Sequence, residues 1–358
     1  MPMMKHCAIL LLCLLFALFP STARAVDARK SGDIDGDGHV SAADAACVLR
    51  MASGIQPMAP GDSPLADVTN DMMVGRTDAI AILLLCTGHI DQFSDFTLSG
   101  ETSLLGDKHL DKFSYRGVVR GHGDYQSRAV SIRVTTFYYA GAVCHLADIY
   151  IQHIESLRTA FAGGGYSAGR AYVSALAAEI NALLAVNGDQ YINLVFGGPL
   201  VRNGEWYRDT LRYDRDVCVL YYDGVIQTFD ANTANVQALR ERQVYQSWVC
   251  GPRLLDDAGQ IMTRFTCPVE FQNRAARTAV GYYEPGHYCL LVVDGTQNPN
   301  SKGIFLEDIS RLFYELGCSA AYNLYGAATA AMVADTGPIS TSYAEQRTVS
   351  DILYIAEP

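Results

Sequence analysis

The chain has 358 residues, a formal net charge of −11 at pH 7 and a hydrophobic fraction of 49%. A chain this acidic has no electrostatic basis for binding nucleic acid, because phosphate backbones are recognised by basic surfaces. We therefore expect a soluble protein without a nucleic-acid partner.

The first 25 residues have the pattern of a secretory signal peptide. Two basic residues precede an apolar run over 7–19, and residues 23–25 read Ala-Arg-Ala, which matches a small-residue cleavage site. The apolar run is too short to span a bilayer, and no later stretch reaches the length of a membrane helix. We predict that residues 1–25 are a signal peptide, that the protein is secreted to the extracellular space or a cell-surface scaffold, and that it has no membrane span.

Eight of the ten cysteines lie after residue 25, an even number for an oxidising compartment. No C-x-x-C spacing occurs, which argues against a zinc site. A disulfide between Cys250 and Cys267 would contribute about 3 kcal/mol by loop entropy. Free buried thiols are an equal alternative.

Two calcium-loop patterns begin 34 residues apart, at Asp33 and at Asp67. The first has oxygen donors at the loop positions that a hard cation requires, and Gly38 at the sharp turn. The second is poorer, because it lacks the turn glycine and has Gly75 at position 9. The pattern predicts one or two Ca²⁺ ions. The predicted ligands are Asp33, Asp35, Asp37, His39 through its carbonyl, Ser41 and Asp44 in the first loop, and Asp67, Thr69, Asp71 and Asp78 in the second.

An apolar helix is expected after each loop, over 42–53 and 76–87, and the two could share a small core. The tandem resembles a type I dockerin over about 32–88, because position 12 is Asp in both loops and no long helix precedes either loop. The resemblance implies a small all-α module with two EF-hand-like loops that binds a cohesin domain of a cellulosome-type scaffold. Loop positions 10 and 11 are Ala-Ala in one repeat and Arg-Thr in the other, so the two binding faces would differ.

The rest of the chain is expected to form one large α+β domain, a mixed sheet with helical layers. We place the dockerin-like module at 26–90, a linker at 91–112 and the large domain at 113–358. Helices are predicted over 169–186 and 305–316, and strands over 131–139, 216–222, 287–293 and 351–355. The domain contains no G-x-G-x-x-G, P-loop, H-E-x-x-H or serine-hydrolase motif.

Short motifs in the large domain occur in the order of the phosphodiester glycosidase family, which the chain resembles from about residue 115 to residue 355. Several of these motifs also suit ordinary turns, since Asn-Gly and Asp-Gly are common hairpin dipeptides. The motifs are Ala147-Asp148-Ile149-Tyr150, Ala185-Val186-Asn187-Gly188-Asp189, Val201-Arg202-Asn203-Gly204, Cys250-Gly251-Pro252-Arg253, Arg277-Thr278-Ala279-Val280-Gly281, Leu290 to Gly295, Ser301-Lys302-Gly303, Leu316-Gly317-Cys318, Ala321-Tyr322-Asn323-Leu324 and Arg347 to Ile352.

The resemblance implies a hydrolase that cleaves a sugar-1-phosphodiester on the glycosidic side, with a carbohydrate or sugar-phosphodiester substrate. Arg277 would hold the phosphate through its guanidinium fork, and Asp189 or Asp294 would stabilise or attack the developing oxocarbenium ion or activate water. The remaining predicted substrate-binding residues are Asn187, Ser301, Asn323, Tyr325, Gly326, Thr329 and Arg347.

The chain departs from the family after Asn323-Leu324. The family pattern continues Asp-Gly-Gly-Gly-Ser, whereas this chain reads Tyr325-Gly326-Ala327-Ala328-Thr329. A phenol titrates near 10 and cannot replace a carboxylate at neutral pH, and a residue that needs positive φ would now be strained. The leading expectation is a scaffold-docked hydrolase acting on extracellular glycans or cell-wall polymers. The alternatives are a catalytically disabled sugar-binding subunit and a structural protein whose one specific contact is the dockerin.

Overall fold

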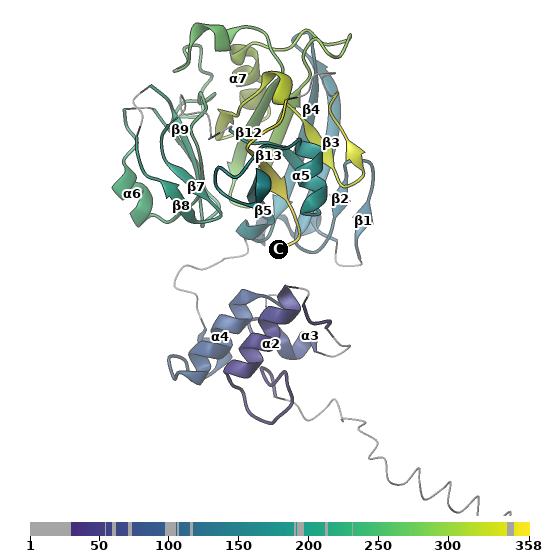
Figure 1. The fold of residues 1–358 in the computed structure, drawn as a ribbon, viewed down its shortest axis with the longest axis vertical. Helices are drawn as coiled ribbons and strands as arrows, with labels where there is room; N and C mark the ends of the chain where they lie inside the picture. The colour runs from purple at the N-terminus through teal and green to yellow at the C-terminus, as the bar shows by residue number, and fades with distance from the viewer. Residues whose placement is uncertain are drawn as a thin grey trace, which may run out of the picture. The chain divides into compact units, whose positions relative to one another are not determined.

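The computed structural model describes residues 30–53, 55–58, 62–70, 74–96, 105, 107–114, 117–189, 191, 197–211, 214–230, 232–341 and 347–358. The chain divides into two compact units, Met1–Ser99 and Gly100–Pro358 (Figure 1). The predicted signal peptide lies outside the described residues. Within the described ranges, no helix is both long and apolar enough to cross a membrane.

The N-terminal unit is a small all-α module. It contains α2 (Ala42–Ala52), α3 (Ser63–Ala66), α4 (Arg76–Cys86) and a 3₁₀ turn, η2 (Phe93–Asp95). Ser41 and Asp44 form a capping box that fixes the start of α2, where the first backbone N–H groups lack helical partners. The predicted helices after the two loops are confirmed to within one residue. Their shared core contains Ala45, Val48 and Met51 of α2 and Ala79, Ala81 and Ile82 of α4.

The C-terminal unit is built on a seven-stranded sheet in the order β1-β2-β3-β4-β13-β12-β14. Every pairing in it is antiparallel. The predicted strands over 131–139 and 287–293 are confirmed as β3 and β13. The strands are β1 (Val119–Arg120), β2 (Tyr125–Gln126), β3 (Val130–Tyr139), β4 (Ala142–Ile151), β12 (Arg277–Glu284), β13 (His287–Val293) and β14 (Ala320–Asn323).

Three smaller antiparallel sheets complete the unit. A five-stranded sheet has the order β16-β15-β6-β17-β5, a three-stranded sheet the order β10-β9-β11, and β7 pairs with β8. The strands are β5 (Leu157–Phe161), β6 (Leu184–Asn187), β7 (Leu200–Arg202), β8 (Glu205–Arg208), β9 (Val217–Tyr221), β10 (Ile226–Phe229), β11 (Val244–Trp248), β15 (Met332–Ala334), β16 (Gly337–Pro338) and β17 (Asp351–Ile355). Figure 1 shows β7, β8, β9 and α6 (Val236–Glu241) gathered at one side of this unit.

Each of the two larger sheets is packed against one helix. The apolar face of α7 (Leu306–Glu315) packs on β12 and β13, with Ile309 and Phe313 fully buried. The apolar residues of α5 (Val173–Glu179) pack on the five-stranded sheet, around Leu176 and Ile352. The α+β class is therefore confirmed, but the described strands pair antiparallel throughout, so the sheets are not mixed as predicted.

One predicted helix is wrong in its length. The helix predicted over 169–186 is only the short α5, because Asn181 turns the chain with φ of 54° and Leu184–Asn187 then forms β6. All four residues of β6 are buried. A strand that is buried on both faces does not alternate apolar and polar residues. The apolar residues of β6 therefore looked like a continuation of the helical pattern in the sequence.

The eight cysteines after residue 25 are all free in the structure, which agrees with the free-thiol alternative and not with a Cys250–Cys267 disulfide. The boundary between the two units, at Ser99 and Gly100, falls inside the predicted linker. Part of that linker is ordered structure, since Phe93 and Phe96 pack against the helical core of the N-terminal unit.

Candidate active site and calcium loops

A cavity of about 220 Å³ lies in the C-terminal unit where β12 begins and β14 ends. Because β12 and β14 are antiparallel neighbours, the first residue of one and the last residue of the other lie at the same end of the sheet. The cavity is lined by Cys250, Gly251, Glu270, Phe271, Ala275, Arg277, Asn323, Leu324, Tyr325, Gly326 and Ala327.

Arg277, the first residue of β12, is a buried cation at this cavity, with 4% of its surface exposed. Its Nη2 donates to the carbonyls of Phe271 at 2.5 Å and Asn273 at 2.6 Å, and its buried Nε has no hydrogen-bond partner. None of the ion pairs among the described residues includes Arg277, and burial lowers the pKa of its guanidinium to about 10. A buried charge that is not compensated favours a bound anion.

Asn323, at the end of β14, also has an unsatisfied buried atom. Its Nδ2 donates to the carbonyl of Leu324 at 2.7 Å, while its Oδ1 has no hydrogen-bond partner. An unsatisfied buried acceptor costs about 1–3 kcal/mol, and a ligand hydroxyl could remove this cost. Arg277 and Asn323 therefore provide a cation and a polar acceptor on the same cavity.

The loop after β14 forms a wall of the cavity and lies against the backbone of Ala276 and Arg277. A Cβ on Gly326 would lie 2.5 Å from the carbonyl oxygen of Ala276, so only glycine fits this approach. Ala327 has φ of 55°, the left-handed conformation that favours glycine. The expected strain at a position where the family has glycine is therefore present. Thr329 closes the loop with a hydrogen bond to the carbonyl of Gly326 at 2.7 Å.

Asn187, the last residue of β6, lies behind this wall and is fully buried. Its Nδ2 donates to the carbonyl of Tyr325 at 2.5 Å, and its Oδ1 accepts from the hydroxyl of Thr278 at 2.5 Å. These bonds connect the five-stranded sheet, the seven-stranded sheet and the cavity loop. Asn187 thus positions the wall in this conformation, and direct contact between Asn187 and a substrate stays a prediction.

Asp189 belongs to a buried ion cluster with Arg202 and Asp351. Nη2 of Arg202 lies 2.7 Å from Oδ1 of Asp189 and 2.8 Å from Oδ2 of Asp351, and Nε lies 3.0 Å from the same Asp351 oxygen. Burial by itself lowers the pKa of Arg202, but the two carboxylates outweigh this effect and raise it. A Cβ on Gly188 would lie 2.3 Å from the Asp351 carboxylate, which explains the glycine before Asp189. None of these three charged residues lines the cavity.

Asp294 follows β13 and forms a separate buried cluster. Its Oδ2 accepts from Asn298 at 2.8 Å and lies 3.2 Å from Nε2 of His145, at an angle unsuited to a hydrogen bond. Its Oδ1 accepts from the backbone N–H of Thr341 at 3.1 Å. Burial alone would raise the pKa of Asp294, but His145, Asn298 and Thr341 together hold it below its ordinary value. The hydroxyl of Ser301 donates to the carbonyl of Asp294 at 2.5 Å, which fixes the turn.

The structure thus brings together part of the predicted site. Arg277, Asn323, Tyr325 and Gly326 line one cavity, while Arg347 is exposed and bonds through its backbone N–H to the carbonyl of Ala328 at 3.0 Å. Sequence reasoning missed Glu270, the acidic side chain among the cavity-lining residues. Glu270 lies in a 3₁₀ turn, η7 (Val269–Gln272), where no spacing pattern marked it.

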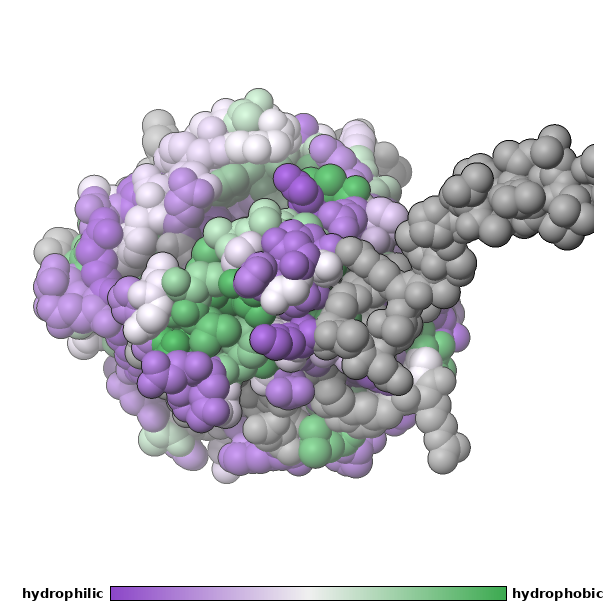
Figure 2. Space-filling model, turned by 90° about the horizontal axis from the view of Figure 1, so that it is seen from below, coloured by the Kyte–Doolittle hydropathy of each residue, from purple (hydrophilic) through white to green (hydrophobic). Residues whose placement is uncertain are grey.

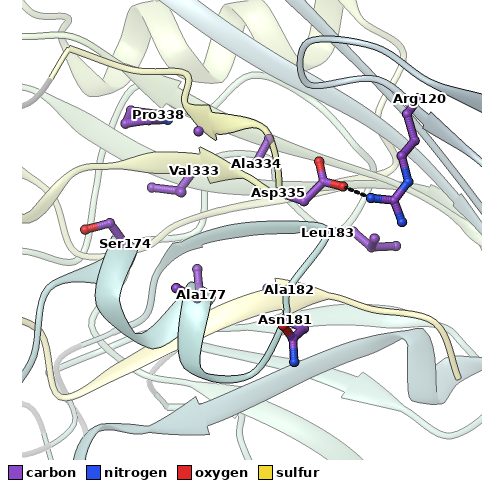
Figure 3. A pocket seen from close by; sticks show the side chains of 12 residues that line it. Arg120, Ser174, Ala177, Asn181, Ala182, Leu183, Val333, Ala334, Asp335 and Pro338 are labelled. Carbon is purple, nitrogen blue, oxygen red and sulfur yellow. Dashed lines mark hydrogen bonds and ion pairs between the residues drawn. The ribbon is translucent and has the colours of Figure 1, made fainter.

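A second cavity, of about 560 Å³, lies between α5 and the strands β15 and β16. Figure 3 shows the side chains of Arg120 and Asp335 facing each other at this cavity, with Nη1 and Oδ2 2.8 Å apart. None of the predicted site residues lines it. It is therefore not the candidate active site.

The first calcium loop of the N-terminal unit has a geometry that suits a cation. The carboxylates of Asp33, Asp35 and Asp37 each offer an oxygen within 4.8 Å of the others, and the buried Oδ1 of Asp33 has no hydrogen-bond partner. Asp44 accepts from the N–H groups of Ile34 at 2.7 Å and Ser41 at 2.8 Å, which closes the loop. Clustered carboxylates with an unsatisfied oxygen are what Ca²⁺ requires, so the residues fit this ion.

The second loop is closed in the same way. Asp78 accepts from the hydroxyl of Thr69 at 2.9 Å and from the N–H of Gly75 at 2.8 Å. Asp67 is described, but Asp71 lies outside the described residues, so the ligand set of this loop stays a prediction. The other first-loop ligands, His39 and Ser41, flank the acidic cluster on the way to α2.

Comparisons with known proteins agree with both halves of the sequence reading. Residues 31–84 match the family model of the dockerin type I domain, and residues 180–356 match that of phosphodiester glycosidase. The second match begins after β5, although β4 and β5 pair with strands inside it, β13 and β17. No curated protein sequence matches the chain significantly.

Among solved structures, the chain is similar to the catalytic domain of zebrafish N-acetylglucosamine-1-phosphodiester alpha-N-acetylglucosaminidase, auto-inhibited by its pro-peptide. The TM-score is 0.53 at 19% identity, over 69% of this chain and 86% of that one, which shows a shared fold. A hypothetical protein from Synechocystis matches with a TM-score of 0.45 at 14% identity, over 64% of this chain and 62% of that one. A putative exported protein from Burkholderia pseudomallei matches with a TM-score of 0.41 at 16% identity, over 60% and 74%.

Proposed function

We propose that this chain, which combines a dockerin type I domain with a phosphodiester glycosidase domain, is a secreted hydrolase that docks on a cohesin and cleaves sugar-1-phosphodiesters in extracellular glycans or cell-wall polymers. The zebrafish enzyme of similar fold is named for an N-acetylglucosamine-1-phosphodiester, which makes that compound the first substrate to test. The observation that carries the proposal is the buried, uncompensated Arg277 on a small cavity that also holds the unsatisfied Oδ1 of Asn323.

The chemistry of such a substrate suits this cavity. When the bond on the sugar side breaks, the leaving group is a phosphate monoester, an anion of low basicity. Cleavage therefore needs little acid assistance and mainly requires a cation that holds the phosphate. Arg277 supplies that cation, and its two bonds to main-chain carbonyls orient it before a ligand arrives. The free Oδ1 of Asn323 can accept a hydrogen bond from a sugar hydroxyl or acetamido N–H.

The proposed cleavage also requires a carboxylate that stabilises the oxocarbenium ion or activates water. Asp189 and Asp294 remain the candidates taken from the family order, yet each is engaged in a buried cluster away from the cavity lining. Glu270 lines the cavity and is exposed, so it can approach a bound sugar without breaking an existing buried ion pair. We add Glu270 to the candidates for this role.

A second candidate function is binding without turnover. It is favoured by Tyr325, which stands on the cavity where the family pattern has Asp, and by the positive φ of Ala327. A site that keeps Arg277 and Asn323 but lacks a carboxylate at position 325 could still hold a sugar phosphate. The chain would then be a carbohydrate-binding subunit on the same scaffold.

The docking half of the proposal follows from the N-terminal unit. Ca²⁺ would be held by Asp33, Asp35, Asp37 and Asp44, and it would neutralise repulsion among these carboxylates and order the loop before α2. Exposed apolar side chains such as Leu49, at 46%, and Leu83, at 40%, stand at equivalent positions of α2 and α4. Figure 2 shows one face of the molecule on which hydrophilic residues surround an area of apolar ones. Such a surface suits a protein partner.

The deciding experiment measures sugar release from a GlcNAc-1-phosphodiester by the chain, by its Tyr325→Asp variant and by its Glu270→Gln variant, with Arg277→Leu as a control that lacks the phosphate-binding cation. Turnover by the native chain that falls at least tenfold in Glu270→Gln supports the hydrolase with Glu270 as its carboxylate. Turnover by Tyr325→Asp alone supports the disabled subunit. No release by either refutes the proposed substrate.

A further inference from the structure

Four aromatic side chains from separate segments form a stack that neither cavity includes. Phe161 ends β5, Tyr166 follows the 3₁₀ turn η5 (Ala162–Gly164), and Tyr207 lies on β8. The ring of Tyr166 is stacked on that of Tyr191 at 5.4 Å and 24°, and on that of Tyr207 at 5.4 Å and 26°. Phe161 contacts Tyr191 and Tyr207 at 5.0 and 4.9 Å. We call these four residues the tyrosine stack.

The base of the tyrosine stack is held in place. Tyr191 is 2% exposed, and its hydroxyl accepts from the N–H of Ser167 at 2.9 Å, which ties the Tyr166 loop to the ring below it. The hydroxyl of Tyr207 donates to the Glu205 carboxylate at 2.6 Å. Tyr166, in contrast, exposes 44% of its surface. The stack therefore supports one exposed ring on a base whose rotamers are fixed.

The position of the stack relates it to the cavity. Tyr191 lies four residues after Asn187, whose amide bonds to the cavity loop at Tyr325. Four extended residues span at most roughly 14 Å. The base of the stack therefore lies within roughly 14 Å, along the backbone, of the residue that holds the cavity loop.

We propose that the tyrosine stack binds neutral sugar units of the glycan that carries the phosphodiester, with Tyr166 stacked against the pyranose ring of a polysaccharide. The inference deepens the proposed function and rests on it for the class of ligand. A preorganised aromatic ring that is 44% exposed suits the apolar C–H surface of a pyranose, and little conformational entropy is lost when it binds. Glu205, exposed beside Tyr207, can accept hydrogen bonds from sugar hydroxyls.

A stacked nucleobase is the competing ligand for an exposed aromatic face. It would bring phosphates to a chain of net charge −11, and the carboxylate of Glu205 lies at the edge of the stack. Proteins that stack bases combine the rings with basic grooves. The observed charge therefore favours a neutral sugar.

The test is affinity gel electrophoresis of the full chain through gels that contain soluble β-glucan, xylan or mannan, with calcium present. Tyr172, 47% exposed and without a ring contact among the described residues, provides the matched control. We expect at least one polysaccharide to retard the chain. Tyr166→Ala should weaken that retardation at least tenfold, while Tyr166→Phe and Tyr172→Ala should leave it within twofold.

The inference is overturned if none of the polysaccharides retards the chain, or if Tyr166→Ala and Tyr172→Ala weaken binding equally. Release of sugar from the small phosphodiester should be the same in the chain and in Tyr166→Ala, because a small substrate does not reach the stack. Sugar release without polysaccharide binding would therefore refute the tyrosine stack alone. Polysaccharide binding that depends on Tyr166, without sugar release, would refute the proposed hydrolase alone.

Discussion

Replacing Arg202 by Leu should strongly destabilise the C-terminal unit. Arg202 is 2% exposed and is the cation shared by Asp189 and Asp351, which are themselves buried. The guanidinium also donates to the carbonyls of Val201 and Ser247. Without it, both buried carboxylates lose the cation that they share.

The expected loss follows from that geometry. Removing one partner of a buried ion pair costs about 3–5 kcal/mol, because the remaining charge stays desolvated. For a unit of this size, 1 kcal/mol changes Tm by roughly 2–4 °C, so Tm should fall by roughly 6–20 °C. Carboxylates that are buried without their cation have raised pKa values. The stability lost in Arg202→Leu should therefore be smallest near pH 4–5 and largest at neutral pH.

The measurement is denaturant unfolding of the chain and of Arg202→Leu at pH 5 and pH 7, followed by the transition of the C-terminal unit. Arg311→Leu is the matched control, because Arg311 forms an exposed i,i+4 pair with Glu307, with side-chain exposures of 48% and 50%. The control should change the free energy of unfolding by no more than about 0.5 kcal/mol. A loss below about 1 kcal/mol for Arg202→Leu, or the same loss at both pH values, would show that the buried-charge reasoning is wrong.

Three further predictions concern the calcium loop, the cavity and the acid limb of stability. Asp33→Ala should weaken Ca²⁺ binding at least a hundredfold in calorimetry, because it removes the buried carboxylate. The control Asp91→Ala, at an exposed residue, should leave the affinity unchanged. Equal Ca²⁺ affinities of the two variants would contradict the site. Arg277→Leu should weaken the binding of a sugar 1-phosphate by about 10- to 150-fold, because charged hydrogen bonds worth about 1.5–3 kcal/mol are lost. An unchanged affinity would show that Arg277 does not bind the phosphate. Asp294 has a lowered pKa in the folded state, so the stability that it contributes is present above pH ~4 and is lost as the pH falls through the folded pKa. Asp294→Asn should therefore reduce the loss of Tm between pH 5 and pH 2.5 in thermal unfolding. An unchanged loss of Tm over this range would contradict the assignment.

Local features of this protein could be predicted from the sequence. The calcium loop and the helix after it depend on residues within about twelve positions, so the spacing from Asp33 to Asp44 was sufficient for both. The strand at His287–Val293 and the helix at Leu306–Glu315 were also predicted, because each has a clear pattern and a turn or polar boundary. The identity of the large domain came from the order of short motifs.

Long-range partners could not be predicted in this way. Asp189 was chosen as a catalytic carboxylate from its motif, yet the fold places it against Arg202 and Asp351, 13 and 149 residues from Arg202 in the sequence. Glu270 reaches the cavity only because Arg277 holds the neighbouring carbonyls of its turn. Neither of these contacts produces a periodic pattern in the sequence.

The sequence by itself determined the two-part organisation, the acidic cluster of the first loop and the residue types available for a phosphate site, because spacing encodes contacts between near neighbours. Only the tertiary structure decided which of those residues share a cavity. That choice depends on which ends of β12, β14 and β6 meet, and strand pairing between distant segments is set by the packing of the whole domain rather than by any local pattern. Arg277 and Asn323 line the same cavity for this reason, and Asp189 and Asp294 form buried clusters that do not line it.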